Sequence, residues 1–340
     1  MSDAVRFGLV GYGAGGRIFH APLIASAENI EFVGVVTTNE ERRAELASQR
    51  PGVAAFDSIA ALAEAGAEAV SISTPAPTHA KLAKEAIAHG LAVVVDKPFA
   101  MDAAEAREVV TAAQEADVLL SVYQNRRWDS DFMTARKLIL EGALGSVRRF
   151  ESRFERWAPD RKPPAAGGGT LLDFGSHLVD QALVLHGPVT RVYAEMRGSG
   201  ELDDDVFLAL HHISGVESHL WGSWRQAAPG PRFRITGTTG TYIINGMDGQ
   251  EALLKAGQSP ADLGDRWGVE AEDTWGSIYR GDTGTPVATE RGRWDAFYPA
   301  FAYALRGDAR VPVDPADAIR SMTVLDAARK SARSGEAIRL

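Results

Sequence analysis

The chain contains no cysteine and no long hydrophobic run. Without cysteine there are no disulfide frameworks, no thiol nucleophiles and no thiolate zinc sites. No apolar run reaches the length that spans a bilayer, and no basic segment with an apolar core precedes the first expected strand, Val5–Val10. We therefore expect a cytoplasmic protein with no secretory signal and no membrane partner.

Positive charge is also scarce: 36 lysines and arginines stand against 45 aspartates and glutamates, a net charge of −9. Nonspecific binding to nucleic acid needs clustered cations, so no nucleic-acid partner is expected. The proportions of hydrophobic residues (45%) and charged residues (24%) are typical of a globular protein. At 340 residues the chain is too long for one ordinary core, and two domains are expected.

Two patterns divide the chain near residue 123. Before that point, short β-branched runs alternate with helical stretches, which indicates right-handed βαβ units and a parallel sheet. After it, polar and apolar residues alternate in longer runs, which favours an antiparallel sheet with one covered face. One long helix, Leu171–His186, interrupts these runs, and residues 250–289 look irregular. The sequence thus predicts an α/β domain at 1–123 and an α+β domain at 124–340.

A glycine-rich loop follows the first expected strand: Gly11, Gly13 and Gly16, with Ala14 and Gly15 between them. In such a Gly-x-Gly-x-x-Gly pattern the first glycine permits a tight turn and the second lets the backbone approach a pyrophosphate. The third allows a helix to pack closely on the strand. Alone the pattern is weak. Here a strand precedes it and a helix follows it, so it predicts a dinucleotide site rather than a merely structural turn.

The end of the second expected strand bears on which dinucleotide binds. An NAD enzyme usually has Asp or Glu there, which accepts a hydrogen bond from the ribose 2′-hydroxyl. This chain has Thr37 and Thr38, with Arg42 and Arg43 one turn later. Small polar residues leave room for a 2′-phosphate, and a guanidinium can bind it, so we expect NADP, with NAD as the alternative. Thr38 and Glu41 also fit a helix capping box, a local role that can coexist with the first.

Two further motifs follow strands of the parallel sheet, whose ligands bind outside the carboxyl ends of the strands. Asp96 and Lys97, fixed by a following proline, are candidates for cofactor contact, and Lys97 is also a candidate for proton chemistry. Thr74 and Pro75, with His79, resemble a loop that passes under the cofactor ribose. His79 could equally be an exposed histidine in a first helical turn.

Polar and aromatic residues near the expected domain boundary are candidates for the nicotinamide or the substrate. Amides and guanidinia at a strand end suit a carboxamide or a polyhydroxylated molecule, whereas the alternative is a solvated hinge. The candidates there are Asn125 for the cofactor and Tyr123 and Arg126 for the substrate. Arg156 and Trp157, later in the chain, are also plausible substrate residues, polar enough for a polyol.

The run Gly167–Asp180 carries the strongest signal of the second half. Asp173 and His177 are four residues apart, which on a helix places their Cβ atoms about 5–6 Å apart on one face. An imidazole beside a carboxylate can transfer protons. The alternatives are a capping box of Asp173 with Thr170 and a His177 that packs against the sheet. A metal site is disfavoured, because no third ligand is evident, and none is predicted.

In this order the motifs resemble the glucose–fructose oxidoreductase, inositol dehydrogenase and rhizopine catabolism family, often called Gfo/Idh/MocA. The resemblance covers essentially the whole chain and rests on the glycine loop, on Asp96-Lys97-Pro98, whose first residue is more commonly Glu, and on Gly167–Asp180. Phe19–Pro22, Ser121–Asp129 and Asp248–Glu251 look closest to the NADP-dependent scyllo-inositol dehydrogenase branch.

The resemblance implies a Rossmann domain followed by an α+β domain, whose large open antiparallel sheet commonly builds dimers or tetramers. It also implies that Lys97, Asp173 and His177 line a cleft near the nicotinamide. The expected reaction is hydride transfer between that ring and a hydroxyl-bearing carbon of a polyol or sugar, an inositol or an aldose. His177 would take the hydroxyl proton, Asp173 would orient the imidazole, and Lys97 would hydrogen-bond the substrate oxygen. Lys97 as the base is the alternative.

Two other functions fit the same fold. One is redox-assisted glycoside cleavage, in which the cofactor is regenerated within each turnover. The other is a non-catalytic, cofactor-sensing protein, against which the presence of Lys97, Asp173 and His177 argues. Fold alone does not decide between them.

Overall fold

The structure is a computed structural model that describes residues 4–160, 168–198 and 202–340. The chain divides into two compact units. Unit 1 contains residues 1–124, 250–267 and 294–319, and unit 2 contains residues 125–249, 268–293 and 320–340. The units are therefore not two continuous halves of the chain, because two later segments return to unit 1.

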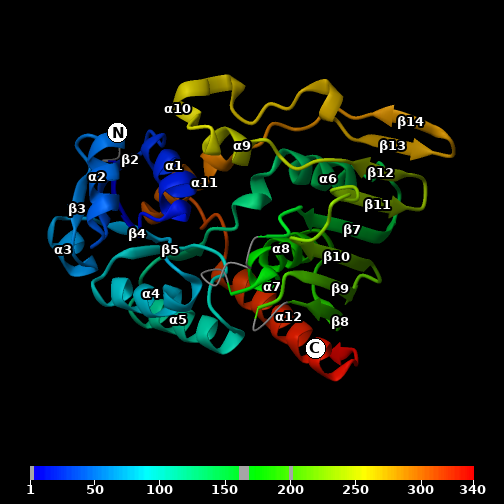
Figure 1. Cartoon of the computed structure of the whole chain (residues 1–340), viewed down its shortest axis with the longest axis horizontal. Coiled ribbons are helices and arrows are strands. Elements are labelled where there is room, and N and C mark those ends of the chain that lie inside the picture. The colour runs from blue at the N-terminus through cyan, green and yellow to red at the C-terminus, as the bar shows by residue number, and fades with distance from the viewer. Residues whose placement is uncertain (1–3, 161–167, 199–201) are drawn as a thin grey trace. The chain divides into compact units, whose positions relative to one another are not determined.

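Unit 1 is built on a parallel sheet with the strand order β3-β2-β1-β4-β5-β6. Figure 1 labels β2, β3, β4 and β5 of these strands. Its strands are β1 (Val5–Val10), β2 (Ile30–Val36), β3 (Ala54–Phe56), β4 (Ala69–Ile72), β5 (Ala92–Val95) and β6 (Leu120–Val122). All neighbouring pairs are parallel, which confirms the predicted α/β fold. The order reverses between β1 and β4, and such a switch point is where open sheets bind ligands at the carboxyl ends of their strands.

Every residue of β4 and β5 is buried, so both faces of this sheet are covered, as is usual for a parallel sheet flanked by helices. The helices of unit 1 in the early part of the chain are η1 (Gly15–His20), α1 (Ala21–Ala25), α2 (Glu40–Gln49), α3 (Ile59–Glu64), η2 (Ala76–Thr78), α4 (His79–Ala88) and α5 (Ala103–Glu115). Later segments add α9 (Gln250–Lys255), α10 (Pro260–Leu263), η5 (Gly264–Arg266), η7 (Trp294–Ala296) and α11 (Phe297–Leu305). Helix α11 belongs to unit 1, although it comes late in the chain, because it packs on β1. Its Tyr298 and Phe301 pack edge-on against Phe7 of β1, with ring centroids 5.4 and 6.0 Å away.

Unit 2 is built on a mixed sheet with the order β14-β13-β12-β11-β7-β10-β9-β8-β15. Its strands are β7 (Val147–Glu155), β8 (Val189–Arg197), β9 (Asp205–His212), β10 (Glu217–Ser223), β11 (Phe233–Gly237), β12 (Thr241–Ile244), β13 (Ser277–Arg280), β14 (Thr283–Pro286) and β15 (Ile338–Arg339). Neighbouring strands pair in antiparallel fashion, as expected, except that β7 and β10 are parallel. The chain leaves β7 through helices before it returns, and such a crossover permits parallel pairing.

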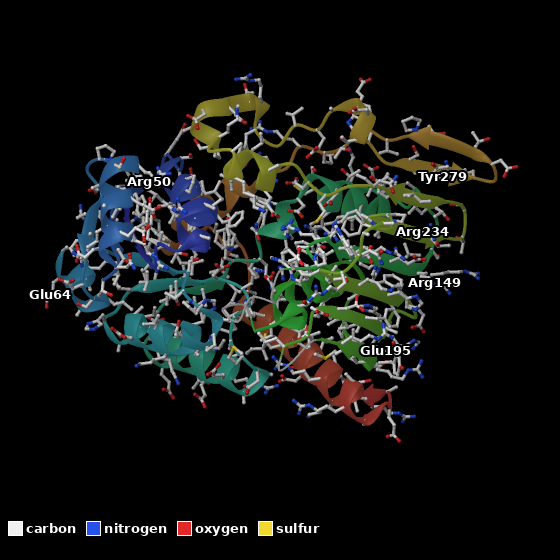
Figure 2. The ribbon with its side chains drawn as sticks, viewed as in Figure 1. Arg50, Glu64, Arg149, Glu195, Arg234 and Tyr279 are labelled. Atoms are coloured by element: carbon white, nitrogen blue, oxygen red, sulfur yellow. The ribbon has the colours of Figure 1, made fainter. Side chains whose placement is uncertain are left out.

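One face of this sheet is covered by helix α8 (Gly175–His186), which packs on β7 and β10. The burial of β9 alternates accordingly: Val206, Leu208 and Leu210 are buried, and the residues between them are only partly so. Figure 2 shows Arg149, Glu195, Arg234 and Tyr279 on the opposite side of the sheet. The predicted α+β fold with one covered face is thus confirmed. The other helices described in unit 2 are η3 (Asn125–Trp128), α6 (Ser130–Leu140), α7 (Thr170–Asp173), η6 (Glu272–Thr274) and most of α12 (Pro315–Ser334).

Two expectations about local structure were wrong. Residues 250–289 are not irregular, because they hold α9, α10 and the hairpin β13–β14, which extends the sheet of unit 2. The sequence does not indicate this hairpin, because β14 is short and exposed and lacks an apolar face. The expected helix Leu171–His186 is two helices, α7 and α8, separated at Phe174. Within the described ranges, no helix combines the length and the apolar character that crossing a membrane requires.

Candidate functional site

The glycine loop joins β1 to η1 in unit 1. Gly11 has a φ of +96°, and a Cβ there would lie 2.3 Å from the carbonyl oxygen of Ser73. A Cβ on Gly16 would lie 2.1 Å from the carbonyl oxygen of Gly11, so the fold itself requires both glycines. Gly13 differs, because the nearest atom to a Cβ there would be in the Arg42 guanidinium, 3.8 Å away. Its backbone is left open, which fits the close approach of a pyrophosphate.

The two arginines that follow β2 have different surroundings. Arg43 donates from Nε to the carbonyl oxygen of Thr37 at 2.9 Å and pairs with Asp57 at 2.5 Å. The guanidinium of Arg42 has no polar partner among the described residues and lies beside Gly13. Arg42 is therefore the cation that can receive a phosphate at this end of the sheet.

The cap of α2 is Asn39, whose Oδ1 accepts the main-chain N–H of Arg42 at 3.0 Å. The capping box considered for Thr38 and Glu41 is therefore not formed. Thr38 is exposed and Thr37 is buried, and the end of β2 carries no carboxylate before α2 begins.

His79 is buried, and the alternative that it is an exposed first-turn histidine is wrong. Its Nδ1 lies 2.7 Å from the carbonyl oxygen of Pro98, and its Nε2 lies 2.8 Å from that of Thr74. The imidazole thus links the loop after β4 to the loop after β5. In this position it supports Thr74 and the exposed Pro75 instead of facing a ligand itself.

Asp96 and Lys97 stand at the carboxyl end of β5. Oδ1 of Asp96 accepts the main-chain N–H of Lys97 at 2.7 Å, and Oδ2 accepts the hydroxyl of Ser73 at 3.0 Å and lies 3.1 Å from Nε2 of His20. Burial alone would raise the pKa of Asp96. The charge and hydrogen bond of His20, with the charges of Lys97 and His79, instead hold this pKa far below its ordinary value. Asp96 is therefore an anchored carboxylate, and Lys97 is half-buried beside it.

The glycine loop and Asp96 are packed together through Ser73. A Cβ on Gly15 would lie 2.8 Å from Oγ of Ser73 and 3.7 Å from Oδ2 of Asp96. Ala14, which precedes Gly15, is exposed at the start of η1. Unit 1 therefore brings the glycine loop, Arg42 and the Asp96-Lys97 pair to one edge of its sheet, as the sequence indicated.

In unit 2, Asp173 ends α7 and His177 lies in the first turn of α8. Phe174 between them keeps right-handed helical backbone angles, and the N–H of His177 donates to the carbonyl oxygen of Phe174 at 3.1 Å. The four-residue spacing thus follows a helical path although the single helix is broken. Asp173 is half-buried and His177 is buried.

The capping box considered for Thr170 and Asp173 is not formed. The cap position of α7 is Gly169, and the carboxylate of Asp203 accepts the N–H of Leu171 at 2.6 Å. Gly167, the first residue of the motif, lies outside the described residues. The described part of the chain holds no group of three or more His, Asp or Glu side chains arranged for a metal ion.

An aromatic cluster stands next to the junction of α7 and α8. The rings of Phe154 and Phe174 stack with centroids 3.9 Å apart, and the His177 ring lies 6.2 Å from Phe154. The Arg156 guanidinium lies 5.1 Å from the Phe154 ring and 5.5 Å from that of Trp224. Arg156, a predicted substrate residue, and His177 thus both lie near the Phe154 ring.

The other residues predicted to contact the nicotinamide or the substrate are placed differently. Tyr123 is 2% exposed, and its hydroxyl donates to a main-chain carbonyl of η1, so it is a core residue of unit 1 and not the pocket residue we expected. Arg126 is buried and pairs with Asp129 at 3.2 Å in unit 2. Asn125 is buried at the start of η3, whereas Trp157 is 59% exposed.

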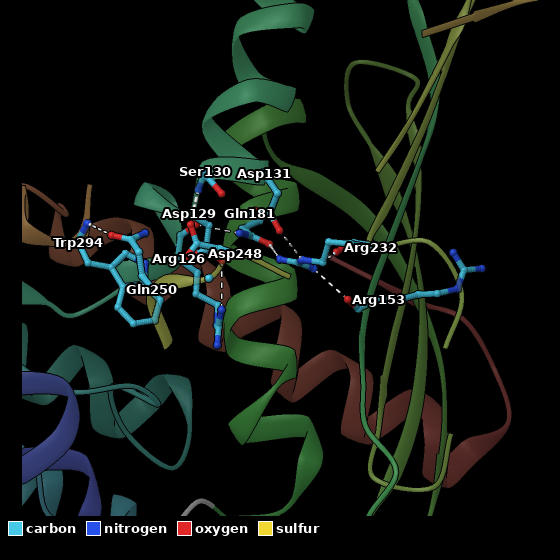
Figure 3. A network of polar contacts seen from close by, with 12 residues as sticks. Arg126, Asp129, Ser130, Asp131, Arg153, Gln181, Arg232, Asp248, Gln250 and Trp294 are labelled. Carbon is cyan, nitrogen blue, oxygen red and sulfur yellow. Dashed lines mark hydrogen bonds and ion pairs between the residues drawn. The ribbon is translucent and has the colours of Figure 1, made fainter. Parts of the chain in front are cut away.

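A buried polar network that the sequence did not suggest fixes α8, the helix that carries His177 (Figure 3). Arg232 pairs with Asp131 at 3.2 Å and donates to Oε1 of Gln181 at 2.8 Å. Nε2 of Gln181 donates in turn to the carbonyl oxygen of Arg126 at 2.9 Å. No sequence signal marks Arg232, because its partners come from distant segments. His20 was also missed as a site residue, although it stands in the Phe19–Pro22 segment noted above.

The fold and these residues define a dinucleotide-binding oxidoreductase. Residues 5–124 match the model of an oxidoreductase family with an NAD-binding Rossmann fold, and residues 132–243 match the GFO/IDH/MocA C-terminal domain. The chain belongs to the GFO/IDH/MocA oxidoreductase family.

Relatives match along the whole chain. The uncharacterized oxidoreductase YdgJ of Escherichia coli K12 is 35% identical, over 98% of both chains. The scyllo-inositol 2-dehydrogenase (NADP(+)) IolW of Bacillus subtilis is 32% identical, over 99% of this chain and 96% of its own. Among solved structures, an oxidoreductase from Bacillus cereus superposes with a TM-score of 0.89 at 27% identity, over 99% of both chains.

Proposed function

We propose that this protein is an NADP-preferring dehydrogenase that transfers a hydride between the nicotinamide and a hydroxyl-bearing carbon of a polyol or sugar. The observation that carries the proposal is the packing of the glycine loop, Ser73 and the Asp96-Lys97 pair at one edge of a parallel sheet. That edge offers an open backbone for a pyrophosphate and a lysine beside the same loop. Similarity to IolW, named as an inositol dehydrogenase, supports an inositol as the substrate, with an aldose as the other member of the class.

The preference for NADP is inferred from Arg42. Its guanidinium lies beside Gly13 without a polar partner in the described residues, and Thr37 and Thr38 place no carboxylate where NAD enzymes usually have one. When bound, the nicotinamide accepts or supplies the hydride. The cofactor would be held by the glycine loop, Arg42, Thr37, Thr38, Thr74, Pro75, Asp96, Lys97 and Asn125.

The proton would be handled by this chain's own side chains. His177 takes it from the substrate hydroxyl during oxidation, and Asp173 orients the imidazole and stabilises its charged form. Lys97 donates a hydrogen bond to the substrate oxygen, and it is the alternative base. The guanidinia of Arg156 and Arg126 lie 5.1 and 4.6 Å from the Phe154 ring. With Trp157, the residue after Arg156, they would offer donors for a polyhydroxylated substrate.

We further propose a homodimer or homotetramer that forms through the face of the unit 2 sheet opposite α8. That face carries a cluster of aromatic rings from β9 and β10: Phe207 lies 5.2 Å from Trp221 and 5.9 Å from His219. The Arg153 guanidinium lies 3.9 Å from the Trp221 ring. We place the protein in the cytoplasm. We take residues 1–123 as the dinucleotide-binding domain and residues 124–340 as the substrate-binding and oligomerisation domain, except that segments 250–267 and 294–319 pack with unit 1.

A spectrophotometric screen tests the function. The purified protein is incubated with NADP⁺ or NAD⁺ and with individual inositols and aldoses, and the absorbance of the reduced nicotinamide is followed. We expect reduction with at least one polyol or sugar and a higher kcat/KM with NADP⁺. Measurable cofactor binding without reduction by any of them would refute the proposal. Cleavage of a glycoside without net accumulation of reduced cofactor would indicate redox-assisted cleavage instead.

A further inference from the structure

His20 is a fully buried histidine that the proposed proton transfer does not use. It ends η1, the helix that starts in the glycine loop. Its Nε2 lies 3.1 Å from Oδ2 of Asp96, and its Nδ1 lies 2.5 Å from the hydroxyl of Tyr298 and 3.2 Å from that of Ser71. The face of the ring packs against Tyr123, with centroids 4.3 Å apart. Partners from β4, the end of β5, the end of β6 and α11 therefore fix the ring on all sides.

The chemistry of these partners sets the direction of the hydrogen bonds. Nε2 of His20 lies at an ion-pair distance from Oδ2 of Asp96, without the alignment of a regular hydrogen bond. Because a carboxylate can only accept, this contact favours a hydrogen on Nε2. On the other side of the ring, the Tyr298 hydroxyl lies 3.1 Å from Oγ of Ser71, and the two hydroxyls close a triangle with Nδ1. The imidazole is thus held with Nδ1 against the two hydroxyls and Nε2 beside the Asp96 carboxylate.

The Asp96 carboxylate in turn holds the main chain of Lys97. Its Oδ1 accepts the main-chain N–H of Lys97, and its Oδ2 accepts the hydroxyl of Ser73. Without His20, the carboxylate would lose the buried imidazole beside Oδ2 and would be held by Ser73 and the Lys97 N–H alone. The acceptor of the Lys97 N–H would then be less firmly fixed, and with it the main chain of Lys97 at the carboxyl end of β5.

We propose that His20 is a positioning residue that fixes the Asp96 carboxylate and, through it, the main chain of Lys97 at the cofactor-binding edge of unit 1. The kinetic consequence rests on the proposed function, because it assumes that Lys97 contacts the substrate. The glycine loop keeps its own backbone bonds, from Gly11 N–H to Val36 and from Arg17 N–H to Gly13. Asp96 and Lys97 are among the proposed cofactor contacts, but the glycine loop and Arg42 do not depend on His20. His20 should therefore matter more for turnover than for cofactor affinity.

The test compares His20→Ala, His20→Gln and Tyr298→Phe with the wild-type protein. His20→Ala should lower kcat about 10- to 100-fold, because small misplacements of a catalytic group cost that much. The dissociation constant for NADPH, measured by fluorescence, should change less than about threefold. His20→Gln, whose amide can donate in place of Nε2–H, should recover most of kcat, and Tyr298→Phe should lower kcat by less than His20→Ala does. His212→Gln, which removes a buried histidine from unit 2, is the matched control and should leave kcat unchanged.

Three kinetic results would overturn the inference: wild-type kcat in folded His20→Ala, no recovery in His20→Gln, or a loss of NADPH affinity that parallels the loss of kcat. If His20→Ala does not fold, His20→Gln and Tyr298→Phe decide. If the wild-type protein oxidises no polyol or sugar, the proposed function fails, and nitrogen-15 NMR of the imidazoles still tests the geometry. We expect Nε2 of His20 to be protonated and its signal to shift in Asp96→Asn. An unprotonated Nε2 would refute the inference.

Discussion

The guanidinium of Arg127 forms two parallel hydrogen bonds with the carboxylate of Asp180, from Nε at 2.8 Å and from Nη2 at 2.7 Å. Arg127 belongs to η3 and Asp180 to α8, one turn after His177. The side chain of Asp180 is 2% exposed and that of Arg127 is 14% exposed. This pair therefore fixes α8 through a buried contact that only a planar, two-donor cation can make in this geometry.

Replacing Arg127 should destabilise the protein strongly. Arg127→Met leaves the Asp180 charge buried without this partner, and we expect the free energy of unfolding to fall by about 3–5 kcal/mol. Arg127→Lys keeps the charge but loses the paired geometry, and we expect a loss of about 1–2 kcal/mol. Urea denaturation measures both. Arg197→Met, at a pair whose arginine side chain is 71% exposed, is the control and should change stability by less than about 1 kcal/mol. Equal losses at the two sites would contradict the prediction.

Much of unit 1 could be predicted because buried parallel strands are read directly from continuous apolar runs. The expected strand Val5–Val10 coincides with β1, and the glycine loop and Lys97 stand at the strand ends where they were expected. The return of α11 to unit 1 could not be predicted, because it depends on contacts of Tyr298 with residues near the start of the chain. In unit 2, alternation located most strands but did not reveal that β7 and β10 are parallel neighbours.

The candidate site was predicted wherever a local motif determines position, and missed wherever a distant partner does. Tyr123 looked like a pocket residue because its hydroxyl is polar, yet its ring packs in a core made with Phe297 and Tyr298. His20 and Arg232 carry ordinary polar side chains whose partners, Asp96 and Asp131, lie far away in sequence. No periodic pattern in a single sequence indicates which polar side chains pair across such long separations.

His186 should make the protein less stable in acid. Burial, with a smaller effect of the neighbouring His212, lowers the pKa of His186 to about 3. Between about pH 6.5, the ordinary pKa of histidine, and about pH 3, the unfolded chain binds a proton at this position and the folded chain does not. The free energy of unfolding should therefore fall with decreasing pH by at most about 1.4 kcal/mol per pH unit from this group.

His186→Phe should reduce this slope. The Phe150 ring lies 5.3 Å away, and Nε2 of His186 has no hydrogen-bond partner within the described residues, so an aromatic ring should be tolerated at neutral pH. Denaturation curves at several pH values between about 4 and 7 measure the slope, which the still-buried His212 keeps above zero. The exposed His89→Phe is the control and should leave it unchanged. A wild-type slope in His186→Phe would contradict the assignment.

Gly13→Ala should separate folding from cofactor binding. Gly13 lacks a positive φ, and a Cβ there meets nothing closer than Arg42 at 3.8 Å, so stability should change by less than about 0.5 kcal/mol. The methyl group would occupy the space through which a pyrophosphate approaches, and we expect the dissociation constant for NADPH to rise about tenfold or more. Gly16→Ala is the contrast, because its Cβ clashes with the Gly11 carbonyl and should destabilise the fold itself. Unchanged NADPH affinity in Gly13→Ala would show that the cofactor does not use this loop as proposed.

Arg42→Ala should weaken NADPH binding and leave NADH binding unchanged. A hydrogen-bonded contact to a phosphate contributes about 1.5–3 kcal/mol, so the dissociation constant for NADPH should rise about 10- to 100-fold. Fluorescence titration with both cofactors measures the difference. The exposed Arg310→Ala makes the same change in net charge within unit 1 and should affect neither. An equal loss of affinity for NADPH and for NADH would mean that Arg42 does not bind a 2′-phosphate.

The proposed proton transfer predicts a large and non-additive effect at α7 and α8. His177→Ala should lower kcat about 10²- to 10⁴-fold, the range that general acid–base catalysis supplies. Asp173→Asn should lower it by less, because it only misorients the imidazole and removes its counter-charge. In the double variant the losses should not multiply, since Asp173 acts through His177. His186→Phe, on the same helix but outside the proposed machinery, is the kinetic control and should keep wild-type kcat. If His177→Ala retains more than about a tenth of wild-type kcat, His177 is not the base, and Lys97→Ala then tests the alternative by the same measurement.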